Sequence, residues 1–221
     1  AIFCLTFEAQ AEIRLPGVIQ NNMVLQQKAD MKFWGWSDPG EKIRVSPGWI
    51  PDSYEAVACE HGEWAVSIPV PEAGGPYQIE FAGKNTLQIE NVMIGEVWVC
   101  SGQSNMHMPV GKLGGEGDWR TGVDNYKEEI ANGDWPNIRM YTVTRETSET
   151  INENCAGSWE VCSPETVAEF SAVGYFFGRE LRKKLDVPIG LINTSWGGTP
   201  AEAWTKKSVL MADSGFKELV E

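Results

Sequence analysis

The stretch that decides the fold is Gly95-Glu96-Val97-Trp98-Val99-Cys100-Ser101-Gly102-Gln103-Ser104-Asn105-Met106. Its first half is a short apolar run that alternates and then becomes rich in strand-forming residues, the pattern of a buried strand. Its second half contains small and polar residues, which end a strand and can cap a helix. On such a sharp turn, a serine hydroxyl lies outside the packed interior, and the backbone N–H groups that begin the helix face the same way. Those N–H groups can donate hydrogen bonds to the negatively charged oxygen that develops during ester hydrolysis. The stretch therefore predicts that Ser104 is the nucleophile of a serine esterase.

From residue 94 onward, strand patterns alternate with helix patterns, which is typical of a parallel sheet with crossover connections. Strands are expected at residues 96–100, 138–143 and 189–193, and a short helix at residues 126–131. Ser163-Pro164-Glu165 has the composition of a helix start. The helix that follows is expected to present one apolar face, formed by Val167, Phe170, Val173, Phe177 and Leu181. A glycine-rich, charged loop at residues 111–122 is expected to shape a cleft. Trp119 in this loop is a candidate sugar platform, although ordinary loop packing explains it equally well.

Residues 12–93 show short strand patterns separated by turn signals at close intervals. The expected strands are residues 23–27, 31–36, 42–46, 54–58, 64–68, 77–81 and 87–90. Their alternating character predicts an antiparallel β-sandwich. This region contains no catalytic constellation, so it is interpreted as an accessory domain, either a structural companion or a sugar-binding module.

The first eleven residues are predicted to be the remnant of a signal peptide. A short apolar run precedes Ala9-Gln10-Ala11, which fits a signal-peptidase cleavage site and places the mature start near Glu12. The alternative is an edge strand or a disordered tail. Export predicts a periplasmic or extracellular location.

The chain of 221 residues has a net charge of −13, from 18 basic and 31 acidic residues. With no basic stripe to neutralise phosphates, a nucleic-acid or anionic-membrane partner is not expected. No apolar run is long enough to span a bilayer, and no Cys/His spacing resembles a zinc site. Cys155 and Cys162 bracket a short loop that a disulfide could close, whereas Cys100 is expected to be a structural thiol. The ten tryptophans fit core packing better than a sugar site.

Two blocks of this sequence resemble a known enzyme family. The stretch quoted first is similar to the first block of the sialate O-acetylesterases and related carbohydrate acetylesterases, members of the SGNH hydrolases. Pro188-Ile-Gly-Leu-Ile-Asn-Thr-Ser-Trp-Gly-Gly-Thr199, followed by Trp204, resembles the block that carries the family's glycine. The similarity runs from about residue 16 to the end of the chain. It implies an α/β fold in which residues 94–221 form the first part of an incomplete SGNH-type three-layer α/β/α domain.

The resemblance also implies an oxyanion hole built from the N–H of Ser104 and an N–H of Gly197 or Gly198. It places a third donor, an asparagine or glutamine side chain, in a later block, and the general base in a still later Asp-x-x-His. The chain contains two histidines: His61, expected in a solvated hairpin loop, and His107. A base three residues after the nucleophile would align poorly with it. Gln103, Asn105, His107 and Trp119 are therefore candidates for lining the substrate cleft.

The resulting hypothesis is a serine esterase that removes O-acetyl groups from carbohydrate through an acetyl-enzyme at Ser104, with 9-O-acetylated sialic acid as the favoured substrate. No metal or organic cofactor is required. An acetyl xylan-type esterase and a non-catalytic carbohydrate-binding or scaffold module are the alternatives. The sheet and the base are expected to be completed by a missing C-terminal part of the same protein or by another chain.

Overall fold

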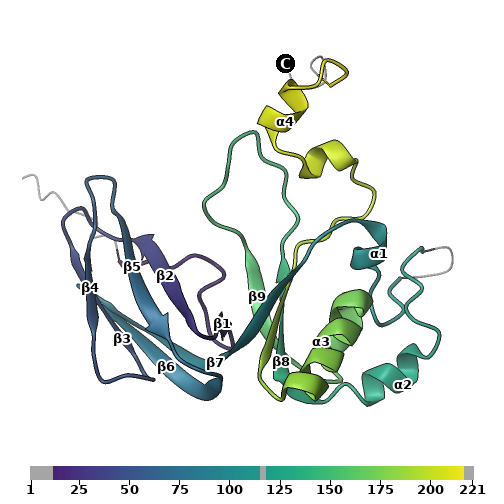
Figure 1. Cartoon of the computed structure of the whole chain (residues 1–221), viewed down its shortest axis with the longest axis horizontal. Coiled ribbons are helices and arrows are strands. Elements are labelled where there is room, and N and C mark those ends of the chain that lie inside the picture. Colours follow the sequence, from purple (N-terminus) through teal and green to yellow (C-terminus); the bar gives the residue numbers. More distant parts are fainter. Residues whose placement is uncertain (1–11, 115–117, 217–221) are drawn as a thin grey trace, which may run out of the picture.

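The computed structural model describes residues 12–114 and 118–216, and its elements form two units that share one long strand (Figure 1). The strands are β1 (Val24–Gln26), β2 (Ala29–Trp36), β3 (Lys42–Pro47), β4 (Tyr54–Val57), β5 (Glu63–Val70), β6 (Gly74–Ala82), β7 (Thr86–Cys100), β8 (Trp135–Val143), β9 (Gly157–Cys162) and β10 (Ile189–Asn193). The α-helices are α1 (Ser104–His107), α2 (Tyr126–Ala131), α3 (Ala172–Leu185) and α4 (Lys207–Met211). Two 3₁₀ turns, η1 (Val167–Glu169) and η2 (Ala201–Trp204), complete the set. The predicted α/β class with parallel strands is confirmed. The predicted signal-peptide remnant at residues 1–11 lies outside the described residues.

In the N-terminal unit, β2 and β5 form a two-stranded antiparallel sheet that packs against the sheet β4-β3-β6-β7. Side chains alternate along these strands between buried and exposed, as expected for strands with one face in a core. The buried layer between the two sheets includes Phe33, Ile43, Ile68, Ile79 and Phe81. β1 departs from the antiparallel pattern because it pairs in parallel with β7.

β7 runs through both units, so the predicted boundary between residues 93 and 94 falls inside one continuous strand. Its first part pairs with β6, and residues 96–100 pair with β10. Gly95 lies where the partners change. Its carbonyl accepts a hydrogen bond from Gln27 N at 2.8 Å, and the N–H of the next residue donates to Pro188 O at 2.9 Å. A Cβ on Gly95 would lie 1.9 Å from the Pro188 carbonyl oxygen. Glycine is therefore needed for the two chain segments to approach this closely.

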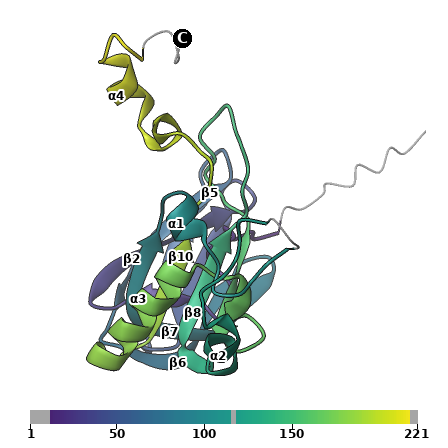
Figure 2. The same cartoon turned by 90° about the vertical axis from the view of Figure 1, so that its right-hand side faces the viewer.

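In the second unit, β7, β10 and β8 are parallel neighbours in that order, and β9 adds an antiparallel edge. α3 covers one face of this sheet (Figure 2). The contact is close because Gly178 of α3 lies over Leu191 of β10. The opposite face carries Tyr141 and Trp159, which share a core with Met23 and other residues of the N-terminal unit. Because β7, β10 and β8 are parallel, their carboxyl ends lie at one edge of the sheet, and α1 follows there (Figure 1).

The helix predicted from Ser163 begins later in the structure. Thr166 Oγ1 donates to Val161 O at 2.6 Å and accepts from Ser163 N at 3.0 Å, so residues 163–166 form a turn, followed by η1. α3 then begins after Ser171, whose hydroxyl accepts from Gly174 N. The predicted apolar face is therefore wrong for α3: Val173 and Phe177 are 48% and 39% exposed. The buried face is formed by Ala172, Gly174, Tyr175 and Gly178.

β9 occupies the segment between Cys155 and Cys162, which the sequence suggested could be a loop closed by a disulfide. Cys155 precedes this extended strand and Cys162 ends it. The five extended steps from Gly157 to Cys162 alone span roughly 17 Å, far beyond the separation of about 6 Å that a disulfide allows between Cα atoms. All four described cysteines are free thiols, so the disulfide that the sequence left open does not form. Cys100 is buried, and burial raises its pKa to about 11, which fits the structural role expected of it.

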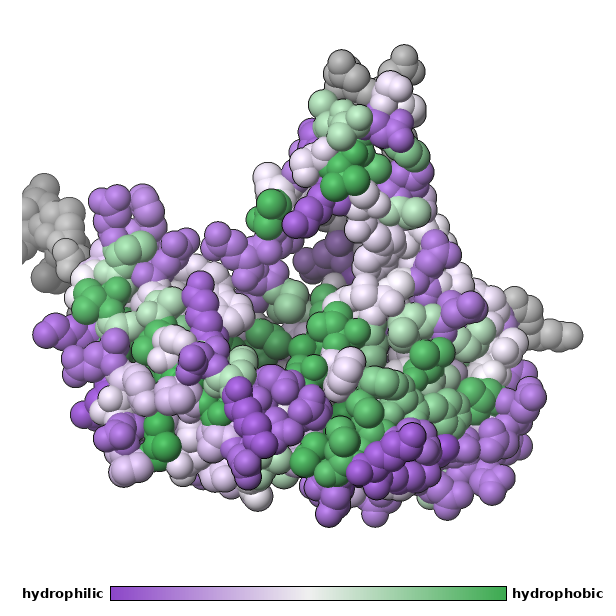
Figure 3. Space-filling view, in the orientation of Figure 1, coloured by the Kyte–Doolittle hydropathy of each residue, from purple (hydrophilic) through white to green (hydrophobic). Residues whose placement is uncertain are grey.

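An apolar surface lies along the outer edge of β7 and the neighbouring face of α3. It comprises Trp98, Val99, Val173 and Phe177, each more than a third exposed. The rings of Trp98 and Phe177 meet edge-on with centroids 5.1 Å apart. Figure 3 shows apolar side chains gathered over α3. Within the described residues, no helix is both long and apolar enough to cross a membrane.

Candidate active site

Ser104 is the first residue of α1, directly after the turn that ends β7. Two hydrogen bonds hold this turn against the end of β10: Thr194 N donates to Cys100 O at 3.0 Å, and Trp196 N donates to Gly102 O at 2.9 Å. Ser104 is exposed, and its hydroxyl forms no hydrogen bond with the rest of the described chain. The structure thus places the hydroxyl at the carboxyl edge of the parallel strands, open to solvent.

The glycine pair predicted for the oxyanion hole lies beside this serine. A Cβ added to Gly197 would stand 3.4 Å from Ser104 Cα and 3.5 Å from Ser104 Oγ. Gly198 has a left-handed backbone (φ +84°), and a Cβ there would meet open space. The two sequence blocks, more than 90 residues apart, therefore converge at one point, and the absence of a side chain at residue 197 keeps that point open.

The side chain of His107 occupies the N–H of one of the two glycines, Gly197 and Gly198. Its Nδ1 accepts a hydrogen bond from Gly197 N at 3.0 Å, whereas the N–H of Gly198 donates to no group among the described residues. The amides that remain available to an oxyanion are therefore those of Ser104 and Gly198. Burial, together with the positive charges of Arg145 and Arg120, lowers the His107 pKa.

A neutral histidine whose Nδ1 accepts a hydrogen bond carries its proton on Nε2. In this arrangement neither nitrogen of His107 is free to take a proton from Ser104. The hydrogen bond from Gly197 N to His107 Nδ1 therefore holds the glycine turn against α1. The other histidine, His61, is largely exposed and lies beside Glu60 in the N-terminal unit.

The other candidate cleft residues take different places. Trp119 packs edge-on against His107, with ring centroids 5.0 Å apart, so it supports the histidine and remains 45% exposed. Gln103 donates through its side-chain amide to Thr199 O, which ties the serine turn to the glycine turn. Asn105 is exposed on α1 and forms no hydrogen bond through its side chain within the described segments.

Two depressions flank this site. A polar groove of about 290 Å³ lies on the side of His107, and its charged lining is Arg120, Arg145, Glu160 and Glu169. A larger cleft of about 620 Å³, here named the tryptophan cleft, lies between residues 143–148, at and after the end of β8, and residues 194–204, after β10. Arg145 borders both depressions. Partial loss of solvation in this groove and the nearby charge of Glu169 raise the pKa of Glu160.

Arg145 and Trp204 were not among the residues predicted for the site. Trp204 was quoted only as part of a sequence block, and its place in the cleft depends on the turn at η2, which periodicity does not reveal. Arg145 follows β8 by two residues, and the rule that parallel strands carry functional groups at their carboxyl ends could have identified it.

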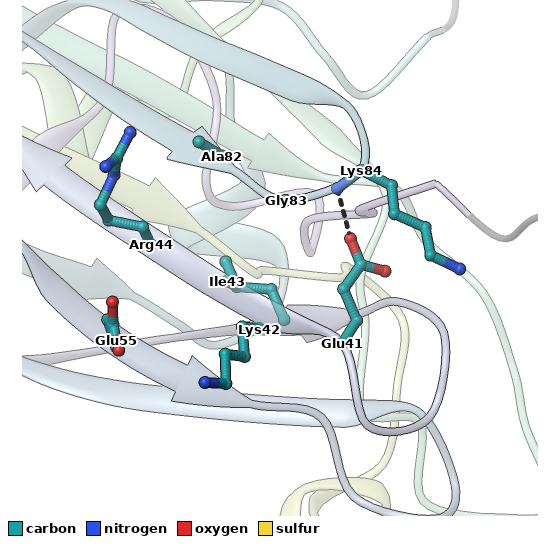
Figure 4. A pocket seen from close by; sticks show the side chains of 8 residues that line it. All are labelled: Glu41, Lys42, Ile43, Arg44, Glu55, Ala82, Gly83 and Lys84. Atoms are coloured by element: carbon teal, nitrogen blue, oxygen red, sulfur yellow. Dashed lines mark hydrogen bonds between the residues drawn. The ribbon is translucent and has the colours of Figure 1, made fainter.

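A separate hollow lies in the N-terminal unit, far from Ser104 (Figure 4). The hydrogen bonds of its buried carboxylate, Glu41, hold the fold together. The hollow is lined by residues of β3, β4 and the turn after β6. Glu41 Oε1 accepts from Lys84 N at 2.7 Å, and Glu41 Oε2 accepts from Asp38 N at 3.2 Å. These bonds hold two turns together and leave the buried carboxylate satisfied. In the described part of the chain, no group of three or more His, Cys, Asp or Glu residues could hold a metal ion.

Comparison with known proteins gives a consistent picture. Residues 94–221 match the family model described as "Carbohydrate esterase, sialic acid-specific acetylesterase". The sialate O-acetylesterases of Homo sapiens and Pongo abelii are each 32% identical to this chain over 219 residues, which cover 90% of this chain and 40% of each relative. A crystal structure of a carbohydrate acetylesterase from Xanthomonas citri superposes with a TM-score of 0.83 at 32% identity, covering 91% of this chain and 44% of that one. The chain thus spans about two fifths of the length of the curated relatives it matches.

Proposed function

This chain belongs to the family of carbohydrate esterases described as sialic acid-specific acetylesterases, and from that membership we propose that it removes O-acetyl groups from carbohydrates with Ser104 as the nucleophile. The observation that carries the proposal is the position of the Ser104 hydroxyl. It is exposed beside the glycine turn at residues 197–198. The favoured substrate is sialic acid acetylated at its 9-hydroxyl, and an acetylated plant polysaccharide such as xylan is the second. Export to the periplasm or the outside of the cell stays a prediction from the sequence.

In the proposed reaction, Ser104 Oγ attacks the acetyl carbonyl carbon and loses its proton to a base. The negative charge that develops on the carbonyl oxygen is received by the amides of Ser104 and Gly198. Loss of one such donor typically raises the barrier by about 3 kcal/mol. The intermediate then expels the sugar oxygen, which takes the proton and leaves an acetyl ester on Ser104. Water attacks this ester, releases acetate and restores the hydroxyl.

The base is proposed to come from polypeptide that completes the sheet, because both nitrogens of His107 are occupied. Along residues 96–100, β7 pairs only with β10 among the described strands. Trp98 and Val99 are exposed at that edge. An unpaired strand edge with apolar side chains favours the addition of another strand. We therefore propose that a further segment of the same protein, or of another chain, covers this edge and supplies the histidine.

A second candidate function is carbohydrate binding without catalysis. The geometry of His107 is the observation that favours it, because the described residues offer Ser104 no base. Added imidazole distinguishes the two candidate functions. If Ser104 is a nucleophile that lacks only its histidine, imidazole in solution can act as the base and raise the rate of acetate release. A protein that only binds carbohydrate releases no acetate with or without imidazole.

The test is acetate release from 9-O-acetylated sialic acid and from acetylated xylan, with and without imidazole, followed by an enzyme-coupled acetate assay. The expected result is release from at least one substrate that rises with imidazole concentration beyond the rate of imidazole alone. Binding of these sugars without any protein-dependent release would favour the second candidate and contradict the esterase.

A further inference from the structure

The tryptophan cleft contains an aromatic wall whose orientation is fixed. Trp204 Nε1–H donates to Thr199 Oγ1 at 2.7 Å, and Thr199 Oγ1–H in turn donates to Trp196 O at 2.7 Å. Despite these bonds, Trp204 is 43% exposed. A large aromatic ring that is both held in place and open to solvent pays little entropy on binding a ligand. It offers a flat apolar surface of the kind that packs against one face of a pyranose ring.

The location of this wall ties it to the proposed chemistry. The cleft is also lined by Gly197 and Gly198, and Gly197 lies against Ser104. Its volume of about 620 Å³ falls within the range of about 300–1,000 Å³ found for sites that enclose small ligands. A sugar ring packed on Trp204 would therefore be separated from the Ser104 hydroxyl only by the turn that contains Gly197 and Gly198.

Arg145 gives the cleft a positive charge without a carboxylate partner in the described chain. Its Nε donates to Ser195 O at 3.1 Å, which fixes the guanidinium plane and leaves its terminal nitrogens without a bond to any described group. Three other arginines of the same unit form ion pairs: Arg120 with Asp118, Arg179 with Glu129 and Arg182 with Asp186. A fourth, Arg139, is buried and donates to Pro136 O and to the side chains of Asn22 and Asn91.

The charged groups near Arg145 do not supply its counter-ion. Arg120 carries the same charge, and it lowers the Arg145 pKa together with burial. Glu146 borders the same cleft but forms no ion pair with Arg145 in the described structure. A planar guanidinium with free donors is suited to bind a carboxylate through two parallel hydrogen bonds.

We propose that the tryptophan cleft binds a sugar that carries a carboxylate, with Trp204 packed against the ring and Arg145 paired with the acid. This inference rests on the proposed function, since it describes how the substrate of that site is held. The shared chemistry is an acidic sugar, and both a sialic acid and a uronic acid, such as a galacturonic acid residue, have it. Arg145 would act as a specificity-determining residue and take no part in bond making or breaking.

The test measures binding by isothermal titration calorimetry in a Ser104→Ala background, so that no turnover occurs. The ligands are two matched pairs: N-acetylneuraminic acid and its methyl ester, and galacturonic acid and its methyl ester. Each pair keeps the ring and removes the charge. We expect at least one free acid to bind about tenfold or more tightly than its ester, as a charge-assisted contact implies. The pair that shows the difference identifies the source of the acid.

Two further variants assign the effect to its residues. Adding Arg145→Gln should abolish the preference for the acid while the ester binds as before, whereas Arg44→Gln, the same charge change on β3, should leave the preference intact. Adding Trp204→Ala should weaken acid and ester alike.

Equal binding of acid and ester, no binding of any ligand, or a preference that survives Arg145→Gln would overturn the proposal. Because the readout is binding, the two proposals can fail separately. Acetate release without acid selectivity would overturn this inference and leave the esterase standing, and selectivity without acetate release would do the reverse.

Discussion

Replacing Ser104 by alanine is expected to lower the imidazole-assisted, protein-dependent hydrolysis of p-nitrophenyl acetate to the background rate, because the attacking oxygen is removed. This activated ester suits the test because its leaving group departs without needing a proton. The measurement is p-nitrophenolate release by the 221-residue chain in the presence of imidazole, with the rate of imidazole alone subtracted.

Ser101→Ala is the matched control for this experiment. Ser101 is also exposed and lies in the same turn, three residues before the proposed nucleophile. Its removal should leave the rate within about twofold, since it takes no part in the proposed reaction. A Ser104→Ala protein that keeps the full rate, or a Ser101→Ala protein that loses it, would remove Ser104 from the mechanism.

Replacing Gly95 by alanine is expected to destabilise the protein by about 3 kcal/mol or more, the upper end of overpacking effects. The added Cβ would lie 1.9 Å from the Pro188 carbonyl oxygen. Backbone atoms must therefore move, and the hydrogen bonds that join β7 to Gln27 and Pro188 must lengthen. The effect is measured as the loss of free energy of unfolding in urea.

Gly40→Ala serves as the control for a glycine replacement without a close contact. Unlike Gly95, Gly40 has a left-handed backbone (φ +77°), and a Cβ there would meet nothing within 4 Å. Its replacement should cost only the strain of that conformation, about 1–2 kcal/mol. If the two variants unfold at the same urea concentration, the close approach at Gly95 does not determine how the two units are joined.

The sequence predicts the strands of the N-terminal unit well because each has a period of two and ends at a turn residue. It does not reveal that residues 87–90 and 96–100 belong to one strand. Asn91 and Gly95 read as strand breakers, yet Asn91 adopts a left-handed conformation (φ +57°) within β7, in a region where the pairing with β6 shifts register. The strand stays continuous because it pairs with β6, β1 and β10 along its length. β1 and β10 come from distant parts of the chain.

The errors around α3 have a related cause. Ser163-Pro164-Glu165 satisfies the local rules for a helix start, but the side chain of Thr166 closes a turn there instead. The buried face of α3 then contains glycines at residues 174 and 178, which allow the helix to lie close to Cys100 and Leu191. A pattern search for large apolar residues misses a face made of small ones, and it selects Val173 and Phe177, which are exposed.

For the proposed site, the sequence predicts Ser104 and the glycine pair because each follows the end of a recognisable strand, and the structure brings the two together. It cannot choose between Gly197 and Gly198, since the choice depends on the hydrogen bond from Gly197 N to His107. The contributions of Arg145 and Trp204 depend on how two loops face each other across the tryptophan cleft. That arrangement is a property of tertiary structure and leaves no local pattern in the sequence.

The most direct test of the central claim is to react the 221-residue chain, with imidazole supplied as the base, with a fluorophosphonate, which forms a stable adduct with a serine whose proton a base removes, and to map the adduct by peptide mass spectrometry. The prediction is modification at Ser104, slowed by acetylated sugars that compete for the site and absent from the Ser104→Ala protein. Modification at a different serine, or acetate release by a protein that shows no adduct at Ser104, would contradict the claim that this hydroxyl and the adjacent glycine turn form the catalytic centre.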